Sequence, residues 1–120
     1  MNSEPTADDF ALLLRYFEEA MAGREAISWS DGFPDYPVYP EAVEALMDYI
    51  SSSPWCNHEY EPGETKEILD HIDSADMTQV RSALTAIARH ERFCDGSWQG
   101  SLEDGILSPV IERARQLTRG

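Results

Sequence analysis

The chain has 120 residues, of which 42% are hydrophobic and 10% aromatic, and it carries a formal net charge of −14. These values exclude an intrinsically disordered chain and predict one domain, residues 1–120, around a single core. No apolar run approaches the roughly 20 residues that span a bilayer. Because the first ten residues also lack the basic and apolar segments of a secretory signal, we expect a soluble cytoplasmic protein.

The negative charge is concentrated in the first two thirds of the chain. Residues 1–76 hold 18 acidic and three basic residues, whereas residues 77–120 hold five acidic residues and six arginines. Such a field repels nucleic acids and anionic membranes and attracts basic partners. We therefore expect no direct contact with nucleic acid or membrane, and a basic protein as partner.

The first predicted helix begins after Thr6, with Asp9 placed to complete a capping box, and ends near Gly23. A segment with three prolines and four aromatics follows at residues 28–40. Prolines argue against a central strand. We predict an ordered loop that lays its aromatic side chains on the helices: Trp29, Phe33, Tyr36 and Tyr39. A small-molecule pocket lined by these rings is the alternative.

Two acidic helices are predicted next. One begins near Pro40 and ends at Pro54, with an apolar stripe at Val43, Leu46, Met47 and Ile50. Its other side carries the acidic row Glu41, Glu44 and Asp48. A short helix near residues 64–73 points Ile68, Leu69 and Ile72 inward and carries the row Glu67, Asp70 and Asp73.

The last part of the chain predicts two further helices. Asp76 and Gln79 form a capping box at the start of a helix whose core face is Val80, Ala83, Leu84 and Ile87. The final helix starts at Ser108-Pro109 and buries Val110, Ile111, Ala114 and Leu117, with a helical turn over residues 102–107 broken at Gly105. The predicted fold is all-α: a single compact domain of four to five helices with ordered aromatic and proline-rich loops.

The densest group of polar side chains is "RHERFCDG" at residues 89–96. We favour the interpretation that it is the polar end of a helix, where Phe93 and Cys94 pack inward and Gly96 turns the chain. On this helix Arg81, Arg89 and Arg92 lie roughly along one side. They contact acidic residues or water, or else form an alternative binding face.

Two chemical interpretations compete with this one. Cys56, His58, His90 and Cys94 are acceptable zinc ligands, but neither half has a strong spacing such as Cys-x-x-Cys. A nucleophilic Cys94 activated by His90 is disfavoured, because the C-terminus of a helix destabilises a thiolate. Known enzyme signature motifs are absent. We therefore predict no cofactor, no metal and no catalytic residues.

Residues 74–117 resemble a family of small, mostly bacterial proteins, the domain-of-unknown-function family numbered sixty-five hundred and eight. The matching segments are Ala75-Asp76-Met77, Ala83-Leu84-Thr85 with Arg89, Glu91 to Gly96, and Gly105-Ile106. The resemblance implies no activity. It implies that the Arg-Phe-Cys-acid-Gly segment is shared and that Arg92 and Asp95 make internal contacts. Cys56 and His58 have no counterpart in the family, which weakens the zinc interpretation further.

The two acidic rows predict a non-catalytic module that binds a basic protein. Such a surface suits an inhibitor that mimics the charge of nucleic acid, as phage inhibitors of host defence do, or an immunity or antitoxin protein. The alternative is a small enzyme or ligand-binding protein that uses the loops at residues 29–39 and 55–60 with His58 or His90. A deep pocket lined by those aromatics beside a histidine or aspartate would favour the alternative, and a convex acidic face without a pocket would favour the module.

Overall fold

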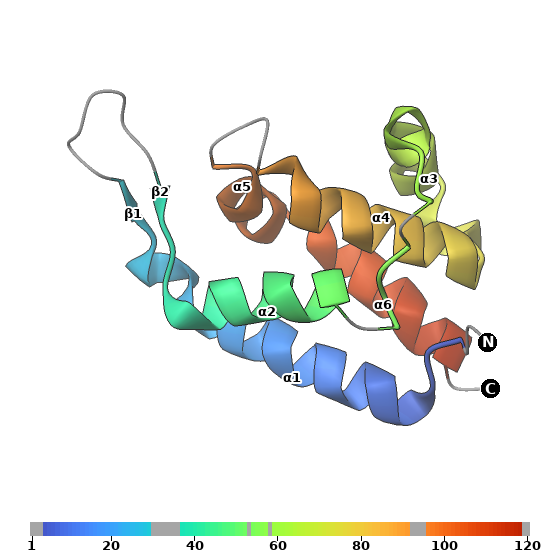
Figure 1. Ribbon diagram of the computed structural model, residues 1–120, viewed down its shortest axis with the longest axis horizontal. Helices are drawn as coiled ribbons and strands as arrows, with labels where there is room; N and C mark the ends of the chain where they lie inside the picture. Colours follow the sequence, from blue (N-terminus) through green and yellow to red (C-terminus); the bar gives the residue numbers. More distant parts are fainter. Residues whose placement is uncertain (1–3, 30–36, 53, 58, 92–95, 119–120) are drawn as a thin grey trace.

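Helices form most of the chain in the computed structural model, which describes residues 4–29, 37–52, 54–57, 59–91 and 96–118. The helices of this part are α1 (Ala7–Gly23), α2 (Glu41–Ser52), α3 (Thr65–Asp70), α4 (Met77–His90), α5 (Ser97–Glu103) and α6 (Leu107–Thr118) (Figure 1). Short 3₁₀ turns occupy Arg24–Ala26, Pro62–Glu64 and Ile72–Ser74. The predicted all-α class is confirmed.

Both predicted capping boxes are present. At the start of α1 the Asp9 N–H donates to Thr6 Oγ1 at 3.3 Å, and the Thr6 N–H donates to Asp9 Oδ2 at 2.8 Å. Asp76 and Gln79 make the same reciprocal pair at the start of α4. These bonds satisfy backbone N–H groups that have no partner inside the helix, so each helix begins at its predicted residue.

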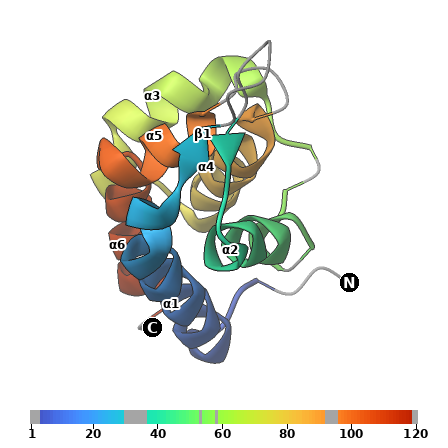
Figure 2. The ribbon, with the colours of Figure 1, turned by 90° about the vertical axis from the view of Figure 1, so that its left-hand side faces the viewer.

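Helix α4 is the centre of the fold and packs against α2, α3, α5 and α6, while α1 packs against α2 and α6. α3 lies on the side of α4 that is away from α1 (Figures 1 and 2). The predicted core faces are buried on α2 (Val43, Leu46, Met47, Ile50) and on α4 (Val80, Ala83, Leu84, Ile87). Trp55, from the loop after α2, is fully buried in the same hydrophobic cluster.

The proline-rich segment contributes a minimal antiparallel ladder. β1 (Ser28–Trp29) pairs with β2 (Pro37–Val38), with Ser28 opposite Val38 and Trp29 opposite Pro37. Trp29 remains 44% exposed, and its indole N–H donates to Gln99 Oε1 at 2.9 Å on α5. Tyr39 packs against Trp98 on the same helix. The other two aromatics, Phe33 and Tyr36, lie outside the described residues.

The end of the chain differs from the prediction. Residues 97–103 form a separate helix, α5, where the sequence predicts only a turn at residues 102–107. The described part has six helices, five of them with seven residues or more, in line with the predicted four to five. α5 follows Gly96, whose φ of +92° requires the left-handed region that glycine adopts without strain. α6 begins at Leu107, one residue before the predicted start. No helix in the described ranges is long and apolar enough to cross a membrane.

Candidate functional site

The loop after α2 is held on α4 by polar contacts. The hydroxyl of Thr85, which is fully buried on α4, accepts the Asn57 N–H at 2.8 Å and donates to the Arg81 carbonyl at 2.8 Å. The Asn57 side-chain amide donates to Ser82 Oγ at 2.8 Å. Thr85 thus supplies an acceptor where the loop backbone would otherwise leave an N–H without a partner.

The predicted arginine face contacts this same loop. Arg81 Nη2 donates to the Cys56 carbonyl at 2.7 Å, and Arg89 Nη2 approaches Cys56 Sγ at 3.9 Å. The Arg89 guanidinium also lies 5.5 Å from the centre of the Tyr60 ring, in cation–π range. Both arginines are half-buried. They bind the molecule's own loop, whereas Arg92 lies outside the described residues.

Within the described part of the "RHERFCDG" segment, Glu91 joins several elements. Its Oε1 accepts the Tyr39 hydroxyl at 2.8 Å and the Trp98 N–H at 2.9 Å, and its Oε2 accepts the Gly96 N–H at 2.8 Å. One carboxylate therefore joins the end of α4, the start of α5 and the segment after β2. Phe93, Cys94 and Asp95 lie outside the described residues, so their predicted contacts are not tested.

Gly96 brings a second element to this junction. A Cβ on Gly96 would lie 2.8 Å from Trp29 Cζ2, closer than real Cβ contacts. The absence of a side chain therefore lets the Trp29 ring lie against the turn between α4 and α5, in addition to permitting the positive φ.

Two of the four residues of the disfavoured zinc alternative, Cys56 and His90, lie in the part of the chain that the structure describes. Cys56 is buried beside Arg89, while His90 is exposed at the end of α4. His58 and Cys94 lie outside the described residues. Among those that are described, no group of three or more His, Cys, Asp and Glu side chains is arranged to hold a metal ion.

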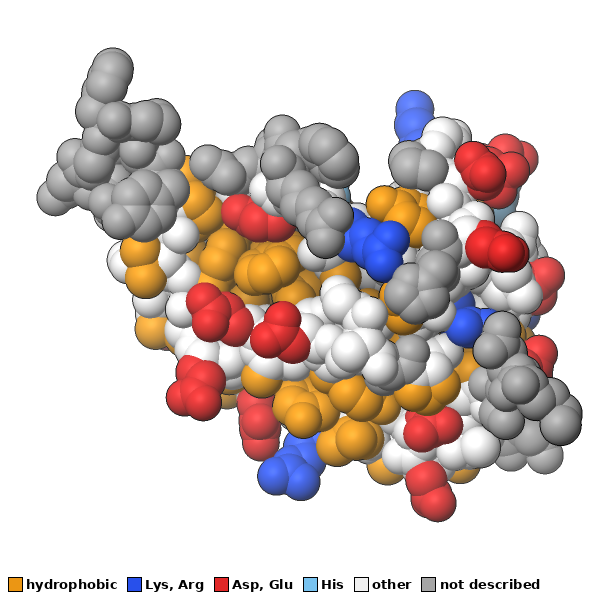
Figure 3. All heavy atoms as spheres, viewed as in Figure 1, with side chains coloured by type: hydrophobic (Ala, Val, Ile, Leu, Met, Phe, Trp, Pro, Cys, Tyr) orange, Lys and Arg blue, Asp and Glu red, His pale blue; other side chains and the backbone are white. Residues whose placement is uncertain are grey.

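The six carboxylates of the acidic rows are all exposed. Glu67 and Asp70 lie on α3, and Asp73 lies in the 3₁₀ turn after it. Figure 3 shows acidic side chains over α2 and over α3, with hydrophobic and basic side chains between the two groups. The rows therefore form two separate patches.

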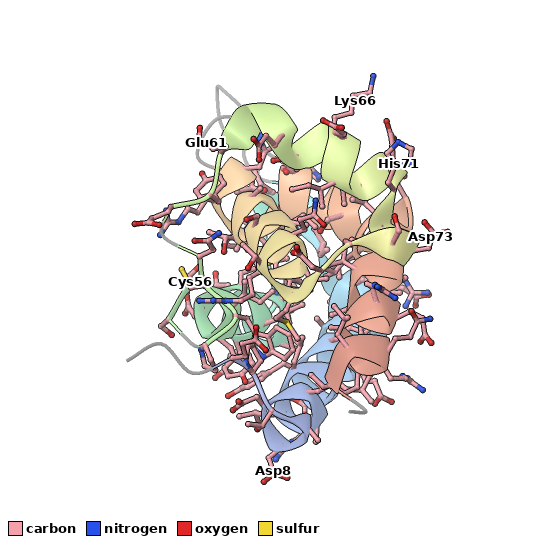
Figure 4. All side chains as sticks on the ribbon, turned by 90° about the vertical axis from the view of Figure 1, so that its right-hand side faces the viewer. Asp8, Cys56, Glu61, Lys66, His71 and Asp73 are labelled. Carbon is pink, nitrogen blue, oxygen red and sulfur yellow. The ribbon has the colours of Figure 1, made fainter. Side chains whose placement is uncertain are left out.

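A cavity of about 720 Å³ lies between α3 and α5, with α4 beneath it. Its apolar lining comes from Leu69, Ile72, Ala86, Ile87, Ile106 and Pro109. Tyr60, Asp70 and His90 also line it. Lys66 contributes as well, but its side chain extends away from the body of the molecule (Figure 4). Of the described aromatics in the two loops that the sequence points to, Tyr60 is at the cavity and Trp55 is buried in the core. Trp29 and Tyr39 lie against α5.

One side chain with a shifted pKa, that of Tyr49, lies away from the cavity, between α1 and α2. Burial raises the pKa of the Tyr49 hydroxyl, and the nearby Asp9 and Tyr16 raise it further, while a hydrogen bond with the Trp55 side chain opposes the shift. The Tyr49 ring stacks on Tyr16 with centroids 4.9 Å apart, and its hydroxyl donates to the Asp9 carbonyl at 3.3 Å. These contacts join α1 to α2 and indicate a structural role.

The model of one protein family, described as "Family of unknown function (DUF6508)", matches residues 18–120. The chain belongs to this family. Comparison with curated proteins and with solved structures finds no match. The matched range of this family member includes all the residues that line the cavity. It also includes Glu91 and its hydrogen-bond partners.

Three residues of this family member have structural roles that the sequence did not indicate: Asn57, Thr85 and Glu91. Each forms a hydrogen bond with a residue of another element; the Asn57 side chain, for example, donates to Ser82 of α4. The one available signal was the threonine itself, since a hydroxyl at a core position of a helix requires a hydrogen-bond partner.

Proposed function

We propose that this protein is a non-catalytic acidic module that binds a basic protein. The observation that supports the proposal is the state of the six row carboxylates. All are exposed, and none forms an ion pair or a side-chain hydrogen bond with another described residue. Their charge is therefore available to a partner, and a cluster of uncompensated charge speeds and orients the encounter with a surface of opposite sign.

The spacing of the charges bears on how specific the mimicry is. On α2, Glu41, Glu44 and Asp48 cover roughly 10 Å of helix axis at about 1.5 Å per residue, which is one charge per about 5 Å. A DNA strand carries one phosphate per about 3.4 Å. The row is therefore less dense than a DNA strand. We propose binding to a basic protein surface as the general function, with a nucleic-acid-binding protein or a basic toxin as the more specific partner.

The test compares two triple variants, Glu41→Gln/Glu44→Gln/Asp48→Asn and Glu67→Gln/Asp70→Asn/Asp73→Asn, against a partner isolated from the native host and then purified. At low salt, the variant that neutralises the binding row should associate on the order of tenfold more slowly than the parent, with a smaller change in the dissociation rate. Stopped-flow or surface plasmon resonance measures both rates.

The matched control is Glu4→Gln/Asp8→Asn/Glu112→Gln, which removes the same charge from exposed positions outside both rows. It should slow association much less than the row variant does. If the partner binds all three variants as fast and as tightly as the parent, the rows serve only to solvate the protein. If the control slows association equally, net charge alone is responsible.

The cavity meets part of the criterion set above for the alternative, a ligand-binding protein, because Tyr60 from one of the two loops lines it together with His90 and Asp70. The binding of a small ligand is therefore a second candidate function. Its volume falls in the usual range of about 300–1,000 Å³ for ligand pockets. Native mass spectrometry of the protein purified from its own host tests this candidate, since a bound molecule adds a discrete mass that is lost on denaturation.

A further inference from the structure

We infer that the cavity between α3 and α5 receives the apolar side chains of a basic amphipathic segment of the partner protein. The inference rests on the proposed function and adds where the partner binds and what part of it makes contact. It follows from two properties of the same site: an apolar floor, and a rim that carries more carboxylates than cations.

The cavity between α3 and α5 is a groove, and its floor and walls are apolar. Ala86 and Ile87 of α4 form the floor, and Leu69 of α3, Ile106 just before α6 and Pro109 of α6 also line the groove. Ile106 is 41% exposed at this site. Burying such a side chain against a partner is favourable by about 25 cal/mol per Å² of apolar surface, so the groove favours an apolar occupant.

The rim of the groove carries more carboxylates than cations. Of the seven acidic residues at positions 59–76, Glu64 and Glu67 line a separate hollow and Asp76 caps α4, so they are not counted with the groove. Asp70 lines the groove itself. On the opposite side, Glu103 and Asp104 are exposed between Ser101 and Gly105, which both line the groove. Lys66 also lines the groove, and its ammonium group extends outward (Figure 4). The carboxylates of Asp70, Glu103 and Asp104 therefore outnumber this one cation among the described residues at the rim.

An apolar floor beside carboxylates favours some occupants of the groove over others. An anionic amphiphile is repelled by the carboxylates, and an uncharged small ligand gains nothing from them. A helix with apolar side chains at i, i+3, i+4 and i+7 and basic side chains elsewhere uses both features, because helix-in-groove recognition inserts one apolar face and leaves the polar face at the rim. Charge complementarity therefore favours a basic amphipathic helix.

The probe is a synthetic fluorescent helix of about four turns, with leucines at that spacing and lysines elsewhere, titrated with the full-length protein by fluorescence anisotropy. Ile106→Lys should raise its Kd by about tenfold, as expected for loss of an anchoring contact and added repulsion. Leu12→Lys is the matched control on α1, since Leu12 is 39% exposed, does not line the groove and gives the same change of charge. It should bind nearly as the parent does.

A second measurement locates the peptide. Amide chemical shifts should change most around Leu69, Ile87 and Ile106 in the parent. Ala86→Phe, which fills the floor without changing charge, should weaken binding as well, and circular dichroism verifies that each variant is folded.

Three outcomes overturn the inference. In the first, the parent fails to bind the peptide at low salt. In the second, Ile106→Lys and Leu12→Lys have equal Kd values for it. In the third, a peptide with glutamates in place of the lysines binds as tightly as the lysine peptide. Tighter binding of an anionic apolar dye in the groove would identify a small-ligand site instead. Shifts centred on α2 would contradict the inference but leave the proposed function standing, whereas a natural partner that ignores both triple variants defeats the proposed function itself.

Discussion

At the scale of single residues, Glu91 is the described residue of the "RHERFCDG" segment that joins three elements. A carboxylate that accepts three hydrogen bonds from two other segments determines where α5 starts and where Tyr39 lies. Hydrogen bonds to a charged group are worth about 1.5–3 kcal/mol, more than neutral ones. A role in joining elements explains why a glutamate stands between the arginines at the end of α4.

Glu91→Gln tests this role. The amide retains one oxygen acceptor but presents an NH₂ group where Oε2 accepts the Gly96 N–H, so the free energy of unfolding should fall by roughly 1–3 kcal/mol. Glu112→Gln is the control, because Glu112 forms only an exposed ion pair with Arg115 at 3.4 Å and should cost under about 0.5 kcal/mol. Urea denaturation compares the two, and equal losses would contradict the assigned role.

At the scale of elements, short-range signals explain the helix starts. The capping boxes of α1 and α4 each involve residues three positions apart, and the apolar stripes of α2 and α4 face the core as predicted. Short-range signals do not explain the contacts of the α4 arginines, since Arg81 and Arg89 turn toward the loop at residues 56–60. Helix α4 therefore uses one face for the core and another to hold a loop.

Asp76→Ala tests the cap of α4. The Gln79 N–H loses its acceptor, and the free energy of unfolding should fall by about 1 kcal/mol, as for other N-cap residues. Asp73→Ala is the control from the preceding turn, since its carboxylate is exposed and makes no hydrogen bond with a described residue; it should be nearly neutral. A decrease in the urea midpoint at constant m-value for Asp76→Ala alone is the expected result.

At the scale of the whole molecule, the net charge of −14 is the dominant property. Like charges repel, and the acidic residues of α2 are spaced at i,i+3 and i,i+4, where each like pair costs a few tenths of a kcal/mol. The molecule tolerates this repulsion because the row carboxylates remain hydrated at the surface. The same charge keeps copies of the protein apart and is the basis on which we propose a basic partner.

The repulsion predicts how stability depends on salt. Raising NaCl from a few mM to about 150 mM shortens the screening length to about 8 Å, so the melting temperature of the parent should rise. Glu41→Gln/Glu44→Gln/Asp48→Asn should melt at or above the parent temperature at low salt and respond less to NaCl. Differential scanning calorimetry measures both. A variant that melts lower than the parent and keeps the full salt response would mean that these carboxylates stabilise the fold.

The sequence by itself determined the all-α class, the starts of α1 and α4, the buried faces of α2 and α4 and the two exposed acidic rows. These features depend on residues within one or two helical turns of each other, so periodicity and capping reveal them. Only the tertiary structure decided that residues 97–103 form a helix, that Arg81 and Arg89 bind a loop, and that α3 and α5 enclose a groove between them. Each of these depends on contacts between segments tens of residues apart, such as Tyr39 with Glu91 or Asn57 with Thr85, and the spacing of residues along the chain does not encode which distant segments meet.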